Sequence, residues 1–109
     1  MQSNTQLLGV LHAAIAGTIG DGIEQMTLAD LAILLLVYST QPPHTVRGLA
    51  AQLALDKGVV SKRLIRLEQW RFVERLDDPA DRRSIWIGCT AQGDRFMRDL
   101  RDLLEQTAG

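Results

Sequence analysis

Two segments with closely spaced cations lie near each other in this sequence. The segment "KGVVSKRLIR" (57–66) carries lysines and arginines at helical spacing, and "DPADRRS" (78–84) places two adjacent arginines among acids. Their basic residues are Lys57, Lys62, Arg63, Arg66, Arg82 and Arg83. Lysine, arginine and hydroxyl side chains anchor DNA phosphates. The chemistry that these segments indicate is therefore binding to duplex DNA.

The distribution of charge supports this interpretation better than the total charge does. The whole chain of 109 residues has a net charge of −1, which alone counts against nucleic-acid binding. Residues 1–56 contain one base and four acids, a balance of −3, whereas residues 57–75 contain six bases and two acids, a balance of +4. The positive charge is concentrated in one segment.

The first part of the chain is predicted to be helical. In residues 1–22 apolar side chains recur at three- and four-residue spacing, as in an amphipathic helix. A second helix is expected after Thr27, an N-cap residue that forms a weak capping box with Asp30, and it must end before Pro42. This helix is apolar nearly all round, so we expect it in the core.

Residues 44–70 predict two further helices joined by a tight turn. Thr45 is expected to cap the first and Asp56 the second, with only "ALD" (54–56) between them. The residues expected to face inward are Val46, Leu49, Ala50 and Leu53, followed by Val60, Leu64 and Leu67. So short a connection makes the helices cross sharply, which is a helix-turn-helix pattern.

A hairpin and a last helix complete the prediction. "FVERL" (72–76) and "SIWIGC" (84–89) are expected strands on either side of a loop at Asp77–Arg83. Thr90 is expected to cap a final amphipathic helix from Ala91 to about Gln106.

The second helix of the helix-turn-helix has the pattern of a helix that enters a major groove. Such a helix needs an apolar face towards its own protein and a polar face outward. Opposite the apolar stripe lie Lys57, Ser61, Lys62, Arg63 and Arg66. An ordinary solvated helix face is the alternative, and the charged hairpin that follows favours DNA binding.

The hairpin gives the paired arginines a role beside this helix. An arginine near its tip can enter the adjacent minor groove, where narrow A·T-rich stretches have enhanced negative potential. Asp78 and Asp81 could pair with a guanidinium and orient it. The alternative, which is compatible with this role, is that Asp81 and Arg83 brace the hairpin itself.

The stretch from Leu49 to Met97 resembles the winged-helix DNA-binding core of the MarR family, the multiple-antibiotic-resistance-type regulators. Its most specific part is "RFVERLDDPADRRSIWIGCTAQG" (71–93), similar to the family pattern of G-hydrophobic-V-x-R, then D-P-x-D-x-R, then L-T-x-x-G. The resemblance runs from about Thr27 to Leu104. It implies homodimeric transcriptional regulators, usually repressors that a small ligand releases from DNA.

The resemblance also implies a fold class and a set of DNA-binding residues. The fold is mainly α with a small β-hairpin, a winged helix-turn-helix with N- and C-terminal helices for dimerisation. We expect a single domain over 1–109, with a dimerisation helix at 1–22, the DNA-binding core with its wing at 27–89 and a C-terminal helix at 90–107. The expected DNA-binding residues are Thr45, Arg47, Lys57, Val59, Ser61, Lys62, Arg63, Arg66, Asp81, Arg82 and Arg83.

The sequence departs from the family pattern at several positions. Gly58 and Val59 stand where the family more often has Ser and Thr, so fewer hydrogen bonds to bases are available, although Val59 could pack against a thymine methyl. Cys89 replaces a usual leucine, and we interpret it as a core residue rather than a redox sensor. Trp70 has no explanation from the sequence.

The chain is short for the family, which bears on its assembly. We expect a dimer through the first and last helices with a smaller interface, and a ligand pocket that is reduced or absent. Whether a small-molecule effector acts on the protein stays open at this stage.

Other functional classes find little support in the sequence. His12 and His44 lie on different predicted elements, and no cluster has metal-ligand spacing. No glycine-rich phosphate loop follows a strand, and Ser61 and Ser84 have no evident His partner. We expect no enzymatic activity, cofactor, metal or membrane span, and a single cysteine fits a reducing cytoplasm.

The sequence thus predicts a dimeric, sequence-specific DNA-binding transcriptional regulator, most often a repressor in this family. Two-fold symmetry predicts a pseudo-palindromic operator in double-stranded DNA. The rival hypothesis is a winged-helix module for protein–protein interaction that does not bind DNA. Its support is the net negative charge and the Gly58–Val59 pair.

Overall fold

The computed structural model describes residues 8–9, 12, 16 and 25–108. The chain divides into two compact units, of which Thr27–Asp94 is one and Met1–Met26 with Arg95–Gly109 is the other. The first unit holds α2 (Leu28–Ser39), α3 (Val46–Leu53), α4 (Lys57–Gln69), β1 (Val73–Asp78), β2 (Asp81–Cys89) and the start of α5 (Ala91–Ala108). Most of the helix predicted at 1–22 lies outside the described residues.

Helix α2 begins and ends where the sequence predicts. The Thr27 hydroxyl accepts a hydrogen bond from the Asp30 N–H at 3.1 Å, and the Asp30 carboxylate accepts one from the Thr27 N–H at 2.9 Å. This reciprocal capping box satisfies two N–H groups that the first turn leaves without helical partners. The helix ends at Ser39, before the prolines.

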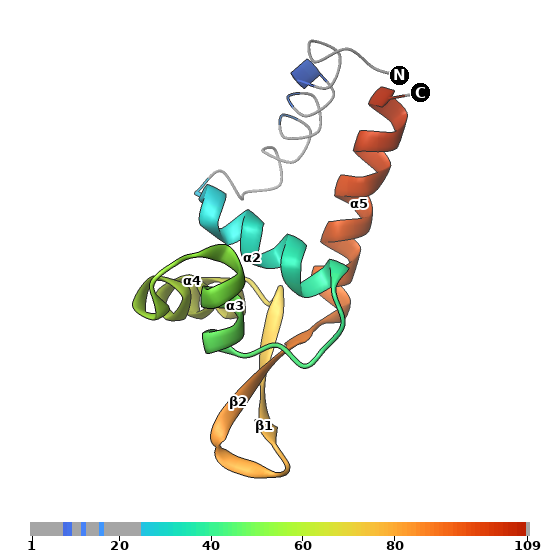
Figure 1. The fold of residues 1–109 in the computed structure, drawn as a ribbon. Helices are drawn as coiled ribbons and strands as arrows, with labels where there is room; N and C mark the ends of the chain where they lie inside the picture. The colour runs from blue at the N-terminus through green and yellow to red at the C-terminus, as the bar shows by residue number, and fades with distance from the viewer. Residues whose placement is uncertain (1–7, 10–11, 13–15, 17–24, 109) are drawn as a thin grey trace. The chain divides into compact units, whose positions relative to one another are not determined.

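Helices α3 and α4 form the predicted helix-turn-helix (Figure 1). The Thr45 hydroxyl caps α3 by accepting from the Gly48 N–H at 3.0 Å. Ala54 ends α3 in the left-handed region, with φ of 54°, and α4 begins three residues later. Asp56 occupies the N-cap of α4 as predicted, but its side chain makes no capping hydrogen bond.

The core of this unit lies where the three helices and the hairpin meet. Its fully buried apolar side chains come from α2, α3, α4 and β1, and include Ile33, Leu34, Leu49, Val60, Leu64, Leu67 and Val73. The predicted inward stripe of α4 is therefore confirmed. In α3, Leu49 and Ala50 are buried, whereas Val46 and Leu53 are only half-buried.

The hairpin extends away from the helices (Figure 1) and differs from the prediction near its tip. The predicted loop at Asp77–Arg83 is wrong, because the strands continue until only Pro79 and Ala80 separate them. Asp78 pairs with Asp81 and Asp77 pairs with Ile85, so residues 82–84 bulge from β2 between these two pairs. Both arginines of the wing therefore belong to a bulged strand rather than to a loop.

A hydrogen-bonded cluster around Tyr38 joins α2 to the start of α5. The Tyr38 hydroxyl donates to the Phe72 carbonyl at 2.6 Å and accepts from the Thr90 N–H at 3.1 Å. Burial raises the pKa of Tyr38 above its ordinary value, although its hydrogen bonds with Thr90 oppose this shift. A Cβ on Gly93 would collide with the Tyr38 hydroxyl and the Phe72 carbonyl, which explains why only glycine fits there.

Two further expectations concern the end of β2 and the final helix. Thr90 caps α5 as predicted, since its hydroxyl accepts from the Gly93 N–H at 2.9 Å. The interpretation of Cys89 as a core residue is wrong, because the residue is exposed. Partial desolvation, together with the nearby charge of Asp94, raises the pKa of its thiol, which therefore stays protonated at neutral pH.

Candidate nucleic-acid interface

The outward side of α4 carries two exposed lysines. Because Val60, Leu64 and Leu67 are fully buried, residues on the opposite side must face away from the core. Lys57 and Lys62 are exposed, and Ser61 is half-buried at the edge of this surface. These three predicted site residues are placed where a ligand can reach them.

Arg63 differs from its neighbour Lys62, because its guanidinium points towards α2. Its Nη1 lies 3.8 Å from Oδ2 of Asp30, which is itself fully buried. The Arg63 side chain is 27% exposed, so this ion pair is partly screened by solvent. The other carboxylate oxygen of Asp30, Oδ1, is buried without a hydrogen-bond partner. Arg63 therefore provides the charge that compensates a buried carboxylate.

Arg66 is also held by the fold, in this case by an aromatic ring. Its guanidinium carbon lies 5.6 Å from the centroid of the Trp70 ring, within the range of a cation–π interaction. The Trp70 ring in turn lies 6.1 Å from that of Phe72, at an interplanar angle of 55°. Trp70, which the sequence left unexplained, thus forms an aromatic support for one arginine of α4.

The N-terminus of α3 lies beside the base of the hairpin. The His44 carbonyl accepts a hydrogen bond from the Ile87 N–H of β2 at 2.8 Å, which ties the start of α3 to the wing. Thr45 is half-buried and occupied in capping, and Arg47 is exposed. Backbone N–H groups at such a helix start are suited to an anion.

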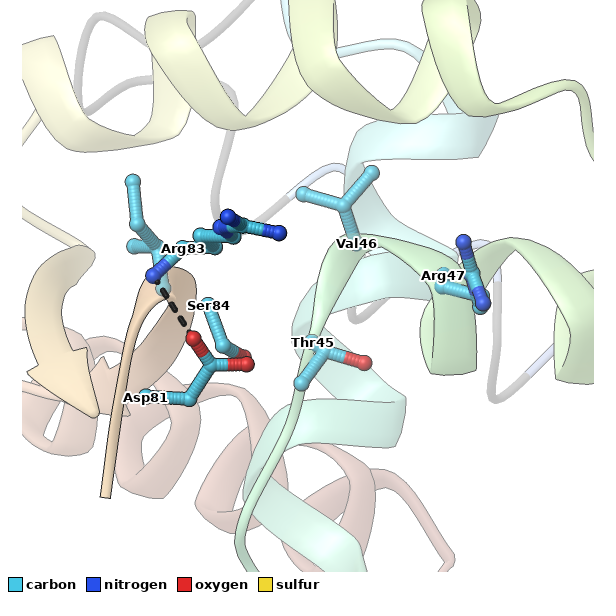
Figure 2. Close-up of a pocket in the computed structure, with 7 residues that line it drawn as sticks. Thr45, Val46, Arg47, Asp81, Arg83 and Ser84 are labelled. Atoms are coloured by element: carbon cyan, nitrogen blue, oxygen red, sulfur yellow. Dashed lines mark hydrogen bonds between the residues drawn. The ribbon is translucent and has the colours of Figure 1, made fainter. Parts of the chain in front are cut away.

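A groove between α3 and the wing brings several predicted residues together. Its volume is about 480 Å³, and its lining residues are Thr45, Val46, Arg47, Asp81, Arg83, Ser84 and Ile85. Figure 2 shows the Arg83 side chain extending from β2 towards the α3 side of the groove, while Arg47 points away from it. Val46, Ser84 and Ile85 also line the groove but were not predicted as site residues.

The acids of the wing shape its turn through backbone hydrogen bonds. The Asp81 carboxylate accepts from the Arg83 N–H at 3.0 Å (Figure 2), and the Asp78 carboxylate accepts from the Ala80 N–H at 2.8 Å. The predicted bracing of the hairpin by Asp81 and Arg83 is present in this form. No ion pair joins the Asp81 carboxylate to the Arg83 guanidinium in the described wing, and the side chain of Arg82 lies outside the described atoms.

Two apolar residues of α4 share the outward surface with the lysines. Val59 is 41% exposed and Ile65 is 48% exposed, more than the charged Arg63 side chain. Val59 belongs to the predicted site, whereas Ile65 was missed. The signal that could have found it is the three-residue spacing of Val59, Lys62 and Ile65, which places them on adjoining parts of one face.

Neither a metal site nor a membrane span is present among the described residues. None of their His, Cys, Asp and Glu side chains form a group of three or more that could hold a metal ion. No helix in this part of the chain is long and apolar enough to cross a membrane.

Comparison with known proteins gives a consistent family assignment. A model of the MarR family matches residues 24–84, which include both helices of the helix-turn-helix and most of the wing. The uncharacterised HTH-type transcriptional regulator YkoM of Bacillus subtilis is 31% identical over 68 residues, or 62% of this chain and 44% of that protein. The chain spans about half the length of the curated relatives that it matches.

Solved structures show the same architecture. CouR from Rhodococcus jostii, bound to p-coumaroyl-CoA, superposes with a TM-score of 0.69 and 27% identity over 92% of this chain and 68% of CouR. A mutant MarR from E. coli, complexed with operator DNA, superposes with a TM-score of 0.70 and 25% identity over 81% of this chain and 61% of that one. The predicted winged helix-turn-helix fold is confirmed by these similarities.

Proposed function

Because the chain belongs to the MarR family, we propose that it is a transcriptional regulator that binds double-stranded DNA. The observation that carries this proposal is the groove in which wing residue Arg83 and the capped start of α3 lie together. A helix-turn-helix and a wing with an exposed arginine that converge in this way suit a DNA backbone and its two grooves. A similar MarR protein forms a complex with operator DNA, which supports DNA binding by this chain as well.

In the proposed complex, α4 lies in the major groove with its exposed side towards the bases. Lys57 and Lys62 neutralise phosphates, and Ser61 donates a hydrogen bond from the edge of the helix. The start of α3 contributes backbone N–H groups, with Arg47 beside them, to a neighbouring phosphate. Arg63 and Arg66 act mainly by fixing the position of α4, since Asp30 and Trp70 already engage them.

The wing serves the adjacent minor groove in this proposal. Arg83 is exposed on a bulged strand whose shape Asp81 fixes by accepting the Arg83 N–H. A guanidinium presented on a firm turn loses less conformational entropy when it enters the groove. Arg82, the neighbouring arginine, is assigned to the same contact by its position in the sequence.

We further propose that the protein acts as a homodimeric repressor. The first and last helices, including α5, would form the dimer, and two α4 helices would then contact half-sites about one helical turn apart. A small-molecule effector that lowers DNA affinity is part of the proposal because the similar CouR binds p-coumaroyl-CoA.

Selection of duplexes from a randomised DNA library, at near-physiological salt, tests the proposal directly. We expect enrichment of a pseudo-palindrome, bound at least a thousandfold more tightly than a scrambled duplex of the same composition. Size-exclusion chromatography with light scattering would report two protein chains per duplex. If folded protein enriches no sequence, DNA binding is refuted and a protein–protein interaction module becomes the better hypothesis.

A further inference from the structure

The recognition surface of α4 has an unusual distribution of polar and apolar side chains. Ile65 is 48% exposed, although the charged side chain of Arg63, two positions earlier, is only 27% exposed. Val59 is 41% exposed on the same helix. Since Arg63 is drawn towards Asp30, the surface left for a ligand is more apolar than the sequence of α4 suggests.

The positions of these residues place them on either side of Lys62. Successive residues of an α-helix turn by about 100°, so residues three apart lie about 60° apart around the axis. Val59, Lys62 and Ile65 therefore form one row across the side of α4 opposite the buried stripe. Gly58, on the same surface, adds no side chain that could hold these apolar groups away from a ligand.

The major groove offers one good partner to an apolar side chain. Its edges carry hydrogen-bond donors and acceptors, and the single apolar group is the C5-methyl of thymine. Resting on the proposed DNA binding, we propose that Ile65 and Val59 recognise two thymine methyl groups in each half-site. Lys62 between them contacts the backbone or a base acceptor.

The geometry of α4 also limits the spacing of the two thymines. Ile65 lies six positions after Val59, a rise of about 9 Å along the helix axis. Base pairs stack about 3.4 Å apart, so the two methyl groups are expected two to three base pairs apart. Recognition by methyl contact also compensates for the few hydrogen-bonding side chains at the start of α4.

Replacement of thymine by deoxyuridine tests this assignment, because it removes the methyl group and leaves the base-pairing and groove hydrogen bonds unchanged. In the selected duplex, each thymine of one half-site is replaced in turn, and the dissociation constant is measured by fluorescence anisotropy at fixed salt. We expect about a fourfold loss of affinity at each of two positions, the effect of one buried methyl group. The remaining thymines should show no change.

Protein variants connect each methyl group to its side chain. Ile65→Ala should weaken binding to the thymine duplex, and at one of the two positions it should abolish the loss of affinity that deoxyuridine causes. Val59→Ala should abolish this loss of affinity at the other position. Leu35→Ala is the matched control, since Leu35 is 46% exposed but lies on α2. This control should bind the thymine duplex as the unmodified protein does, and deoxyuridine should still weaken its binding at both positions. Circular dichroism would verify that all three variants are folded.

The outcomes separate this inference from the function on which it rests. Tight binding with no deoxyuridine effect overturns the methyl contacts and leaves DNA binding intact. If deoxyuridine weakens binding equally in the unmodified protein, in Ile65→Ala and in Val59→Ala, the methyl contacts are also overturned. The methyl group would then act through DNA shape. If no duplex binds at all, the proposed function itself fails.

Discussion

Lys62 and Arg63 are adjacent in the sequence, yet they belong to two regions of α4 with different tasks. Lys62 lies on the outward side and is exposed to solvent. Arg63 lies on the side towards α2, where its guanidinium faces the buried carboxylate of Asp30 at 3.8 Å. A third cation, Arg66, lies over the ring of Trp70. The outward region is available to a ligand, and the anchored region holds the helix in place.

This difference shows that charged residues on one exposed helix can have partners within the protein, as Arg63 and Arg66 do. A lysine or arginine gains little from a phosphate if it must first leave a partner within the protein, because the unpaired partner then carries a desolvation cost. For Arg63 that partner is a fully buried carboxylate, so the cost is larger than for an exposed pair such as Arg75 and Glu68. In the proposed complex, the anchored arginines would fix the position in which the outward residues of α4 meet the DNA.

The largest expected effect comes from removing the anchor itself. Asp30→Ala should lower the free energy of unfolding by about 1 to 2 kcal/mol, because the Thr27 N–H loses its capping acceptor and the part-exposed Arg63 loses its ion pair. Urea denaturation followed by circular dichroism measures this. Asp56→Ala is the control, since Asp56 is also an N-cap residue but makes no capping hydrogen bond, and it should cost less than about 0.5 kcal/mol. Equal losses in both variants would contradict the role of the ion pair.

The sequence predicts the elements of this unit well, since local signals define them. Thr27, Thr45 and Thr90 each cap the predicted helix through their hydroxyl groups. The three-residue turn and the buried stripe of α4 also follow from cap positions and from apolar spacing of three and four residues. Such signals act within a few residues of one another, so no tertiary information is needed.

The features that the sequence did not predict depend on contacts between distant segments. The partner of Arg63 lies 33 residues earlier, and the support for Arg66 required the position of the Trp70 ring, which helix periodicity does not give. The bulge that presents Arg83 depends on strand register, which the apolar and polar pattern of so short a hairpin does not fix. The exposure of Cys89 likewise depends on what packs against the end of β2.

The next largest effect is the loss of DNA affinity expected when one of two wing arginines is removed. Arg83→Ala should lower affinity for the selected duplex about tenfold, with the greater part lost where the flank is A·T-rich. Arg75→Ala, on β1, should change affinity little, because Arg75 pairs with Glu68 at 3.3 Å and lies outside the groove beside α3. Anisotropy titrations with A·T-rich and G·C-rich flanks measure both. Equal losses for the two variants would show that the wing contributes only general charge.

The salt dependence of binding distinguishes the two regions of α4 directly. Lys62→Ala should reduce the slope of log K against log salt by about 1, since one phosphate contact is lost. Arg63→Gln should leave the slope unchanged, because its guanidinium neutralises Asp30 rather than a phosphate. Titrations at four salt concentrations are sufficient for both slopes. A reduced slope in Arg63→Gln would show that Arg63 leaves Asp30 when DNA binds.

The smallest effect should be the coupling between Arg66 and Trp70. A double-mutant cycle with Arg66→Met and Trp70→Leu is expected to give a coupling free energy of about 0.5 to 1 kcal/mol in urea denaturation. The cycle is needed because Trp70 also contacts Phe72, and a single substitution would combine both interactions. Trp70→Phe keeps an aromatic face and should retain part of the coupling. If the coupling is zero while Trp70→Leu still destabilises the protein, the tryptophan acts through Phe72 rather than through Arg66.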